Sequence, residues 1–204
     1  MSLKFVTILF FFVAGSHLQA NAYYLRRVVK ELRVGNGAPW GTWGEPRFCG
    51  KGEYAVGYNM KIEGRGGDDT SLNAILLRCE TRENDYYAGY AESQLGPWGD
   101  WRRDVKCERN KFLTAFSLQV ESSQGGGDDT AANWVKFKCR SFDHGNKSEL
   151  YRSPGHGYWG SFGGWSDSCP GKSAVCGIQT AIESPQGNGD DTALNDVKLF
   201  CCSD

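Results

Sequence analysis

Three short segments of the sequence each place two adjacent aspartates after glycine and before threonine. They read GRGGDDTSLN at 64–73, GGGDDTAAN at 125–133 and GNGDDTALN at 187–195. Two carboxylates ~5 to 9.5 Å apart can protonate and attack a glycosidic bond. Clustered carboxylates also offer calcium the oxygen ligands it prefers. The segments therefore raise three alternatives, namely glycoside chemistry, a calcium site and a turn used three times.

We favour the repeated turn. Asp side chains in Gly-rich segments bond nearby backbone N–H groups, and Thr is a common first residue of a strand. An acid and a base need different environments to hold different pKa values, which three equal copies do not provide. The spacing does not single out a metal loop, so we predict no metal and no cofactor.

A site would instead use positions at which the copies differ. Glu63, Glu121 and Glu183 end equivalent predicted strands, but the loop to the first aspartate has four residues after Glu63 and six in the other copies. Glu63 and Asp68 are therefore the candidate catalytic pair, although solvated glutamates at strand ends are the simpler interpretation. Candidate carbohydrate-binding residues are Asp69, Asp128, Asp190 and Trp134.

Trp134 is a candidate because strand alternation places it on the outward side, beside Lys136. The six aromatics that open the copies have a simpler explanation as wedges between sheets, because large aromatic side chains dominate burial in small folds. A stacking platform for sugar rings is their alternative role. They are Trp40, Trp43, Trp98, Trp101, Trp159 and Phe162.

These residues belong to a threefold internal repeat. Trp40, Trp98 and Trp159 open the copies, and Cys79, Cys139 and Cys201 close them at separations of 60 and 62 residues. Copies of ~60 residues that bury one face need each other to complete a core. We predict one domain over 23–204, built of copies at about 40–97, 98–158 and 159–204, with 23–39 closing the third sheet.

Within each copy the hydrophobic residues recur with the period of strands. Val56, Tyr58, Met60 and Ile62 alternate with other residues, and the segment from Asn73 to Cys79 alternates in the same way. The 204-residue chain has 27 glycines and few helix signals. The sequence therefore predicts an all-β fold of three small sheets around a pseudo-threefold axis.

The start of the chain predicts secretion. Residues 1–22 contain Lys4, an apolar run of about eleven residues and the small-x-small sequence Ala20-Asn21-Ala22, which is typical of a cleaved signal peptide. The run is too short to span a bilayer, and we expect no membrane partner. Removal of this segment leaves a net charge of −2, which gives no footprint for nucleic acid. Asn146 begins a glycosylation sequon.

Eight cysteines in a secreted chain predict disulfides. The repeat pairs Cys49 with Cys79, Cys107 with Cys139 and Cys169 with Cys201. Cys176 and Cys202 then form the fourth bond, although exchange of partners between Cys201 and Cys202 stays open, since eight cysteines allow 105 pairings.

The motifs GDDT(A/S)xN and WGxW/F, the segment GIQTAIESPQGNGDDTALNDVKLFCC and the order of the cysteines resemble the vitelline membrane outer layer protein 1 family. The resemblance covers nearly the whole chain after the leader. It implies a β-prism of three Greek-key sheets and a place in an egg envelope or another secretion. It also implies extracellular matrix or egg-envelope partners and N-acetylglucosamine-containing glycans, with glycosyl transfer or hydrolysis on such oligosaccharides as the alternative function.

Overall fold

The computed structural model describes residues 26–64, 70–82, 87–122, 131–185 and 192–204. The predicted leader 1–22 and the six turn aspartates lie outside these ranges. All the regular elements in the described ranges are strands, which confirms the all-β prediction. No helix in the same ranges is long and apolar enough to cross a bilayer.

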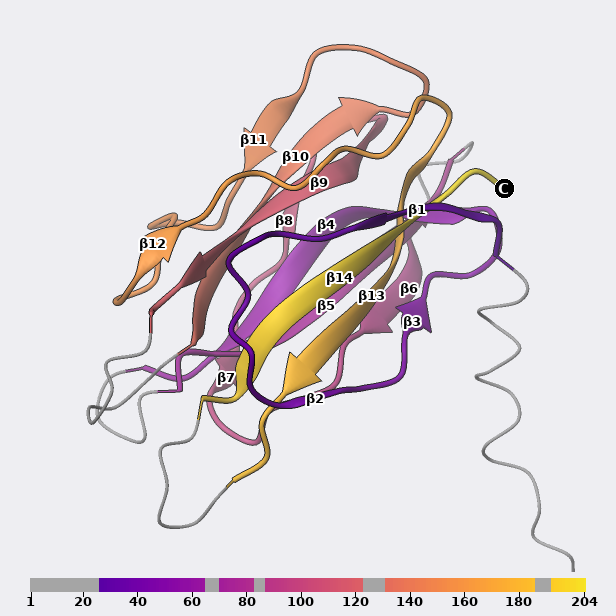
Figure 1. Ribbon diagram of the computed structural model, residues 1–204. Coiled ribbons are helices and arrows are strands. Elements are labelled where there is room, and N and C mark those ends of the chain that lie inside the picture. The colour runs from indigo at the N-terminus through magenta and orange to yellow at the C-terminus, as the bar shows by residue number, and fades with distance from the viewer. Residues whose placement is uncertain (1–25, 65–69, 83–86, 123–130, 186–191) are drawn as a thin grey trace, which may run out of the picture.

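The strands form three antiparallel sheets (Figure 1). The first has the order β6(Tyr87–Glu92), β5(Leu72–Thr81), β4(Glu53–Ile62), β7(Asp100–Trp101), and β8(Val105–Lys106) also pairs with β4. The second has the order β11(Ser148–Leu150), β10(Ala132–Ser141), β9(Lys111–Val120), β12(Ser161–Phe162). The third has the order β1(Val28–Leu32), β14(Leu194–Cys202), β13(Ala174–Ile182), β2(Thr42–Trp43), and β3(Arg47–Phe48) also pairs with β13.

Each sheet has Greek-key order. In the first sheet, β4, β5 and β6 are consecutive neighbours, and β7 returns to the free side of β4. The second sheet repeats this with β9 to β12. In the third sheet the N-terminal strand β1 takes the place of the third strand by pairing with β14 (Figure 1).

Each copy therefore contributes one strand to the sheet of the copy before it. The opening strand of each copy pairs with the central strand of the copy before it, so β7 lies beside β4, β12 beside β9 and β2 beside β13. The central strands β4, β9 and β13 also contact one another. Three Greek-key sheets that enclose one core form a β-prism, which confirms the predicted fold class.

The core has two parts along the prism. The larger cluster draws on all three sheets and includes the fully buried Tyr58, Phe116 and Ile178. The smaller cluster lies where the central strands begin, and there the rings of Tyr54, Phe112 and Phe142 meet with centroids 4.8 to 5.9 Å apart.

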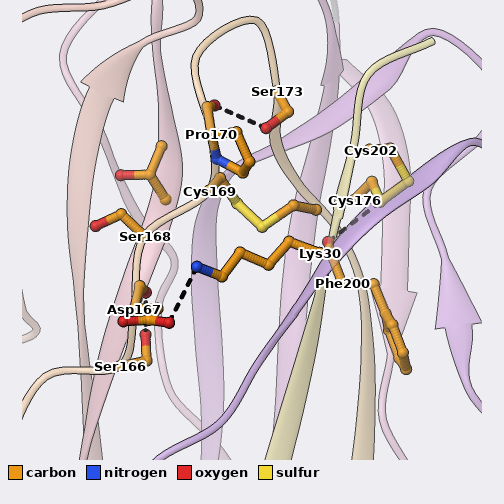
Figure 2. The surroundings of a disulfide bond; sticks show 12 residues. Lys30, Ser166, Asp167, Ser168, Cys169, Pro170, Ser173, Cys176, Phe200 and Cys202 are labelled. Atoms are coloured by element: carbon orange, nitrogen blue, oxygen red, sulfur yellow. Dashed lines mark hydrogen bonds and ion pairs between the residues drawn. A yellow bond between two sulfur atoms is a disulfide. The ribbon is translucent and has the colours of Figure 1, made fainter.

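The four disulfides are those that the repeat predicts. Cys49–Cys79, Cys107–Cys139 and Cys169–Cys201 recur in the three copies. Cys176–Cys202 joins β13 to β14 and settles the alternative that the sequence left open (Figure 2). Lys30 of β1 reaches Asp167 beside the Cys169–Cys201 bond, with Nζ 3.0 Å from the carboxylate (Figure 2).

Candidate functional site

The candidate catalytic residue Glu63 follows the last residue of β4. One of its carboxylate oxygens, Oε2, accepts the hydroxyl proton of Thr70 at 2.6 Å and the backbone N–H of Thr70 at 3.1 Å. These two bonds tie the end of β4 to the residue that leads into β5. Asp68, the second member of the candidate pair, lies outside the described residues, as do Asp69, Asp128 and Asp190.

Glu183 in the third copy has the same partners. Its Oε2 accepts the Thr192 hydroxyl at 2.6 Å and the Thr192 backbone N–H at 3.4 Å. Glu63 and Glu183 therefore share their threonine contacts, although the loops that follow them differ in length. Two carboxylates with the same threonine partners fit a repeated structural role better than an acid and a base.

The asparagine three residues after each threonine continues the network. Asn73 Nδ2 donates to Thr70 Oγ1 at 2.7 Å, and Asn195 Nδ2 donates to Thr192 Oγ1 at 2.9 Å. Asn73, Asn133 and Asn195 are all fully buried. The residue after each threonine position, Ser71, Ala131 or Ala193, has a positive φ of 41 to 56°. The backbone at this position is thus similar in the three copies.

These asparagines also reach the opening of the next copy. Asn73 Oδ1 accepts the backbone N–H of Trp98 at 3.1 Å, and Asn133 Oδ1 accepts that of Trp159 at 3.1 Å. In the third copy the backbone carbonyl of Asn195 accepts the N–H of Ala38, two residues before Trp40, at 3.0 Å. The first copy is thereby linked to the second, the second to the third and the third to the first.

The glycine after each opening tryptophan completes this contact. Gly41, Gly99 and Gly160 have φ values of 79, 76 and 70°. A Cβ added to Gly99 would lie 2.3 Å from the carbonyl carbon of Ile62, and one added to Gly160 would lie 2.2 Å from the carbonyl oxygen of Val120. Only glycine combines this φ with so close an approach to backbone. The Trp-Gly motif and the described threonine and asparagine residues of the second motif form one joint between copies.

The structure buries Trp134 and leaves the opening aromatics partly buried, with Phe162 packed against the core. Trp134 was expected to point outward, but it is only 7% exposed. The physical reason is that Ile62 and residues 152–158 border the same cavity as Trp134 and leave it little open surface. The prediction that it offers an exposed face to a sugar is therefore wrong. The opening aromatics, expected as core wedges, are half-buried, and Trp101 is 38% exposed.

Three of the cavities are each lined by residues from separate parts of the chain. One of about 800 Å³ runs between residues 44–48 and 90–95, and one of about 420 Å³ lies between residues 36–40 and the end of β9. A third of about 280 Å³ lies beside Trp134, with Arg102, Arg152, His156 and Tyr158 among its lining.

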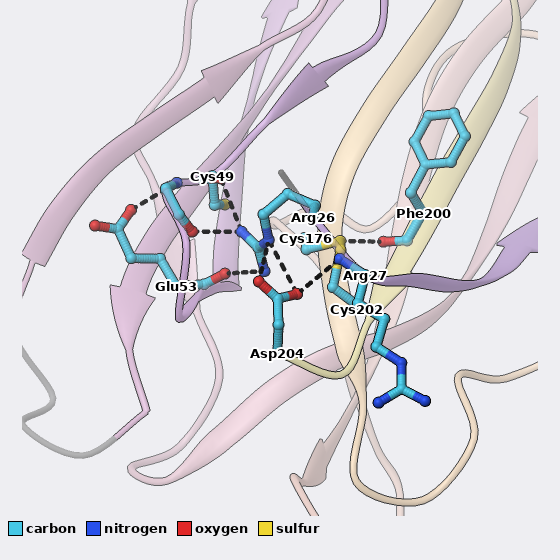
Figure 3. Close-up of polar contacts among 9 residues, drawn as sticks. Arg26, Arg27, Cys49, Glu53, Cys176, Phe200, Cys202 and Asp204 are labelled. Carbon is cyan, nitrogen blue, oxygen red and sulfur yellow. Dashed lines mark hydrogen bonds and ion pairs between the residues drawn. A yellow bond between two sulfur atoms is a disulfide. The ribbon is translucent and has the colours of Figure 1, made fainter. Parts of the chain in front are cut away.

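The opposite end of the prism is held by two arginines that no sequence pattern singled out. Arg26 donates to the carbonyls of Cys49, Gly50 and Glu53 and pairs with Asp204 at 3.1 Å (Figure 3). Arg140 donates to the carbonyls of Cys169, Pro170 and Ser173 in the equivalent loop. Both loops begin with a cysteine and a Gly- or Pro-containing turn. This shared pattern was the one sequence signal that could have pointed to a pair of equivalent arginine-binding loops.

Two tyrosines have strongly raised pKa values. Burial raises the pKa of Tyr58 well above its usual value, and its hydroxyl donates to Val135 O and accepts the Arg152 N–H, each at 3.1 Å. A hydrogen bond to Asp104 raises the pKa of Tyr90 to about 12. Both phenols are therefore hydrogen-bond donors at neutral pH and not candidate bases.

Metal binding finds no support among the described residues, where no three His, Cys, Asp or Glu side chains lie together as a possible ion site. Asn146 is exposed and so accessible to a glycosylating enzyme. The described residues thus form a joint between copies, an end of the prism at which Arg26 and Arg140 bind loop carbonyls, and the three cavities above.

The fold and its threefold joint define a disulfide-bonded β-prism protein. The comparisons assign its family, since residues 30–204 match the model for vitelline membrane outer layer protein I. The chain belongs to this family.

Two relatives support the assignment. The chain is 45% identical over 174 residues to the vitelline membrane outer layer protein 1 homolog of Homo sapiens, covering 84% of this chain and 82% of that protein. It is 41% identical over 191 residues to the Mus musculus homolog, covering 92% and 90%.

Solved structures with a similar fold include a mannose-specific jacalin-related lectin from Morus nigra in complex with mannose. That chain is 13% identical, with a TM-score of 0.48 and coverage of 86% of this chain and 95% of the lectin. An artocarpin–mannotriose complex is 11% identical, with the same TM-score and coverage of 86% and 97%.

Proposed function

We propose that this chain is a secreted structural or matrix protein of an egg envelope or another secretion, and that it recognises carbohydrate. The observation that carries the proposal is the closed joint between the copies. Glu63 and Glu183 are engaged by threonines in the same way, which supports a structural role for the repeated motif. The proposed partners are matrix or envelope components, including glycans that contain N-acetylglucosamine.

Secretion is supported by the leader-like residues 1–22 and by the four disulfides, which form in oxidising compartments. Expression in a secretory host followed by N-terminal sequencing should give a mature chain that begins at Tyr23. Retention of residues 1–22 on the secreted chain would contradict the leader.

The alternative, glycosyl transfer or hydrolysis on N-acetylglucosamine oligosaccharides, would need a carboxylate pair in two different environments. A glycan-binding panel on the mature protein, with chito-oligosaccharide turnover followed in parallel, separates the two. We expect binding to extracellular glycans without turnover. Turnover would establish the alternative, and retention of no glycan at all would remove carbohydrate recognition from the proposal. Boiled and reduced protein serves as the control for nonspecific retention.

A further inference from the structure

The cavity beside Trp134 has the features of a ligand site. Its volume is about 280 Å³, close to the lower end of ~300 to 1,000 Å³ seen for small-molecule pockets. That space suits one ring-sized group. Its lining comes from the first copy, through Ile62 and Ser71, and from the second copy, so it lies at a junction between sheets, a common place for a binding site.

The indole of Trp134 lies in this lining with an unmet hydrogen bond. Trp134 is 93% buried, as its exposed fraction is 7%, and its Nε1 is buried without a hydrogen-bond partner among the described residues. A buried donor without a partner costs about 1 to 3 kcal/mol. The indole nitrogen can only donate, so a ligand that met this need would present a hydroxyl or carbonyl oxygen.

The charge of the cavity is positive. Arg102 and Arg152 both line it, and no Asp or Glu is found among its described lining residues. One Arg102 N–H reaches Ile62 O at 3.2 Å, and one Arg152 N–H reaches Arg103 O at 2.9 Å. A guanidinium has five N–H donors, so these contacts orient both groups and leave donors for a carboxylate, which guanidinium binds in a bidentate manner.

Two rings complete the lining. Tyr158 is 58% exposed and contacts the ring of Trp159 edge-on at 5.5 Å. Its aromatic face can cover the apolar side of a small ring. His156 Nδ1 lies 2.9 Å from Gly157 O and so donates to it, which turns the other ring nitrogen into an acceptor in the neutral imidazole. Hydroxyl groups are suitable partners for such a nitrogen.

We propose that this cavity binds a sugar residue that carries a carboxylate, such as a uronic or sialic acid. The arginines would take the carboxylate, the Trp134 N–H a hydroxyl or acetamido oxygen, and Tyr158 the apolar face of the ring. This inference rests on the proposed carbohydrate recognition and assigns its ligand class and place.

The test is titration calorimetry of the mature protein with methyl glucuronide and with methyl N-acetylneuraminide, using methyl glucoside as the neutral control. We expect an acidic sugar to bind at about 1 mM or tighter and the neutral sugar to bind at least about tenfold more weakly. Arg102→Gln should weaken acidic-sugar binding about tenfold or more, the loss of one charge-assisted bond. Arg103→Gln, an exposed neighbour outside the lining, should change it less than about twofold.

Trp134→Phe, which removes the N–H and keeps an aromatic ring, should also weaken binding of the acidic sugar. If this variant does not fold, Arg102→Gln alone decides the test. Equal affinity for acidic and neutral sugars, or equal effects of Arg102→Gln and Arg103→Gln, would overturn the inference. If neutral chito-oligosaccharides bind and neither acidic sugar does, the inference fails and the proposed function stands. If no glycan binds, the inference fails together with the carbohydrate recognition in the proposed function, and the structural role stands.

Discussion

The side-chain carbonyl of Asn73 accepts the backbone N–H of Trp98 at 3.1 Å. The two residues belong to different copies of the repeat, and each belongs to a motif that recurs three times. The same side-chain bond joins Asn133 to Trp159, and in the third copy a backbone bond from Ala38 to Asn195 takes its place. Removal of this bond and of its counterparts should weaken the whole prism.

Asn73→Ala should lower the free energy of unfolding by about 1 to 3 kcal/mol, because the partly buried N–H of Trp98 loses its partner. Asn133→Ala should cost a similar amount through Trp159. Urea unfolding of the unglycosylated protein measures both. Asn146→Ala, at an exposed position, is the control and should stay within about 0.5 kcal/mol of wild type. A loss at Asn73 no larger than at Asn146 would contradict the joint.

Gly99→Ala should cost more than Gly52→Ala. Both glycines have φ near 75°, at 76 and 75°, so both substitutions carry the ~1 to 2 kcal/mol penalty of a left-handed backbone. Gly99 also approaches Ile62 and Glu63 backbone, whereas an added Cβ at Gly52 meets nothing within 4 Å. The added clash at Gly99 should contribute about 1 to 3 kcal/mol more. Equal melting temperatures for the two variants would show that the close approach carries no cost.

Much of this joint could be read from the sequence, and part of it could not. The spacing of the motifs and cysteines predicted three copies, their strands and the disulfides, because these features are local or periodic. The pairing of Trp98 with Asn73 was not predicted, since nothing in either motif names a partner in another copy. Trp134 was misjudged because strand alternation does not account for the segment 152–158 that covers it.

Tyr58→Phe should destabilise the protein by about 1 to 3 kcal/mol at neutral pH, since Val135 O and the Arg152 N–H lose a buried partner. It should also change the response to alkali. The folded pKa of Tyr58 is raised, so the folded state keeps a proton that the unfolded chain releases above about pH 10. The stability that this provides is complete below pH ~10 and falls as the pH rises further.

Denaturant unfolding between neutral pH and the alkaline range compares the two proteins. We expect the Tyr58→Phe variant to lose less stability than wild type above pH ~10. Parallel losses in both proteins would contradict the role of Tyr58.

The Cys176–Cys202 bond has no counterpart in the other copies, and its sequence separation is 26 residues. Replacement of both cysteines by alanine should cost about 3 to 4 kcal/mol by the loop-closure model. Thermal unfolding checks this value.

Alkylation of wild type without reduction should label no cysteine, because all eight are bonded. Stoichiometric labelling of Cys176 or Cys202 would contradict the pairing.

The most direct measurement of the central claim, that the repeated motif is a joint and not a catalytic site, compares Glu63→Gln with Glu183→Gln. Both side chains accept two hydrogen bonds from a threonine, so both variants should lose about 1 kcal/mol of stability as a charged acceptor becomes neutral. Melting temperature, glycan binding and chito-oligosaccharide turnover are measured on the same samples. The account predicts equal losses of stability with binding and turnover as in wild type. A Glu63→Gln protein that melts like wild type and loses roughly 10²-fold in turnover, while Glu183→Gln does not, would contradict it.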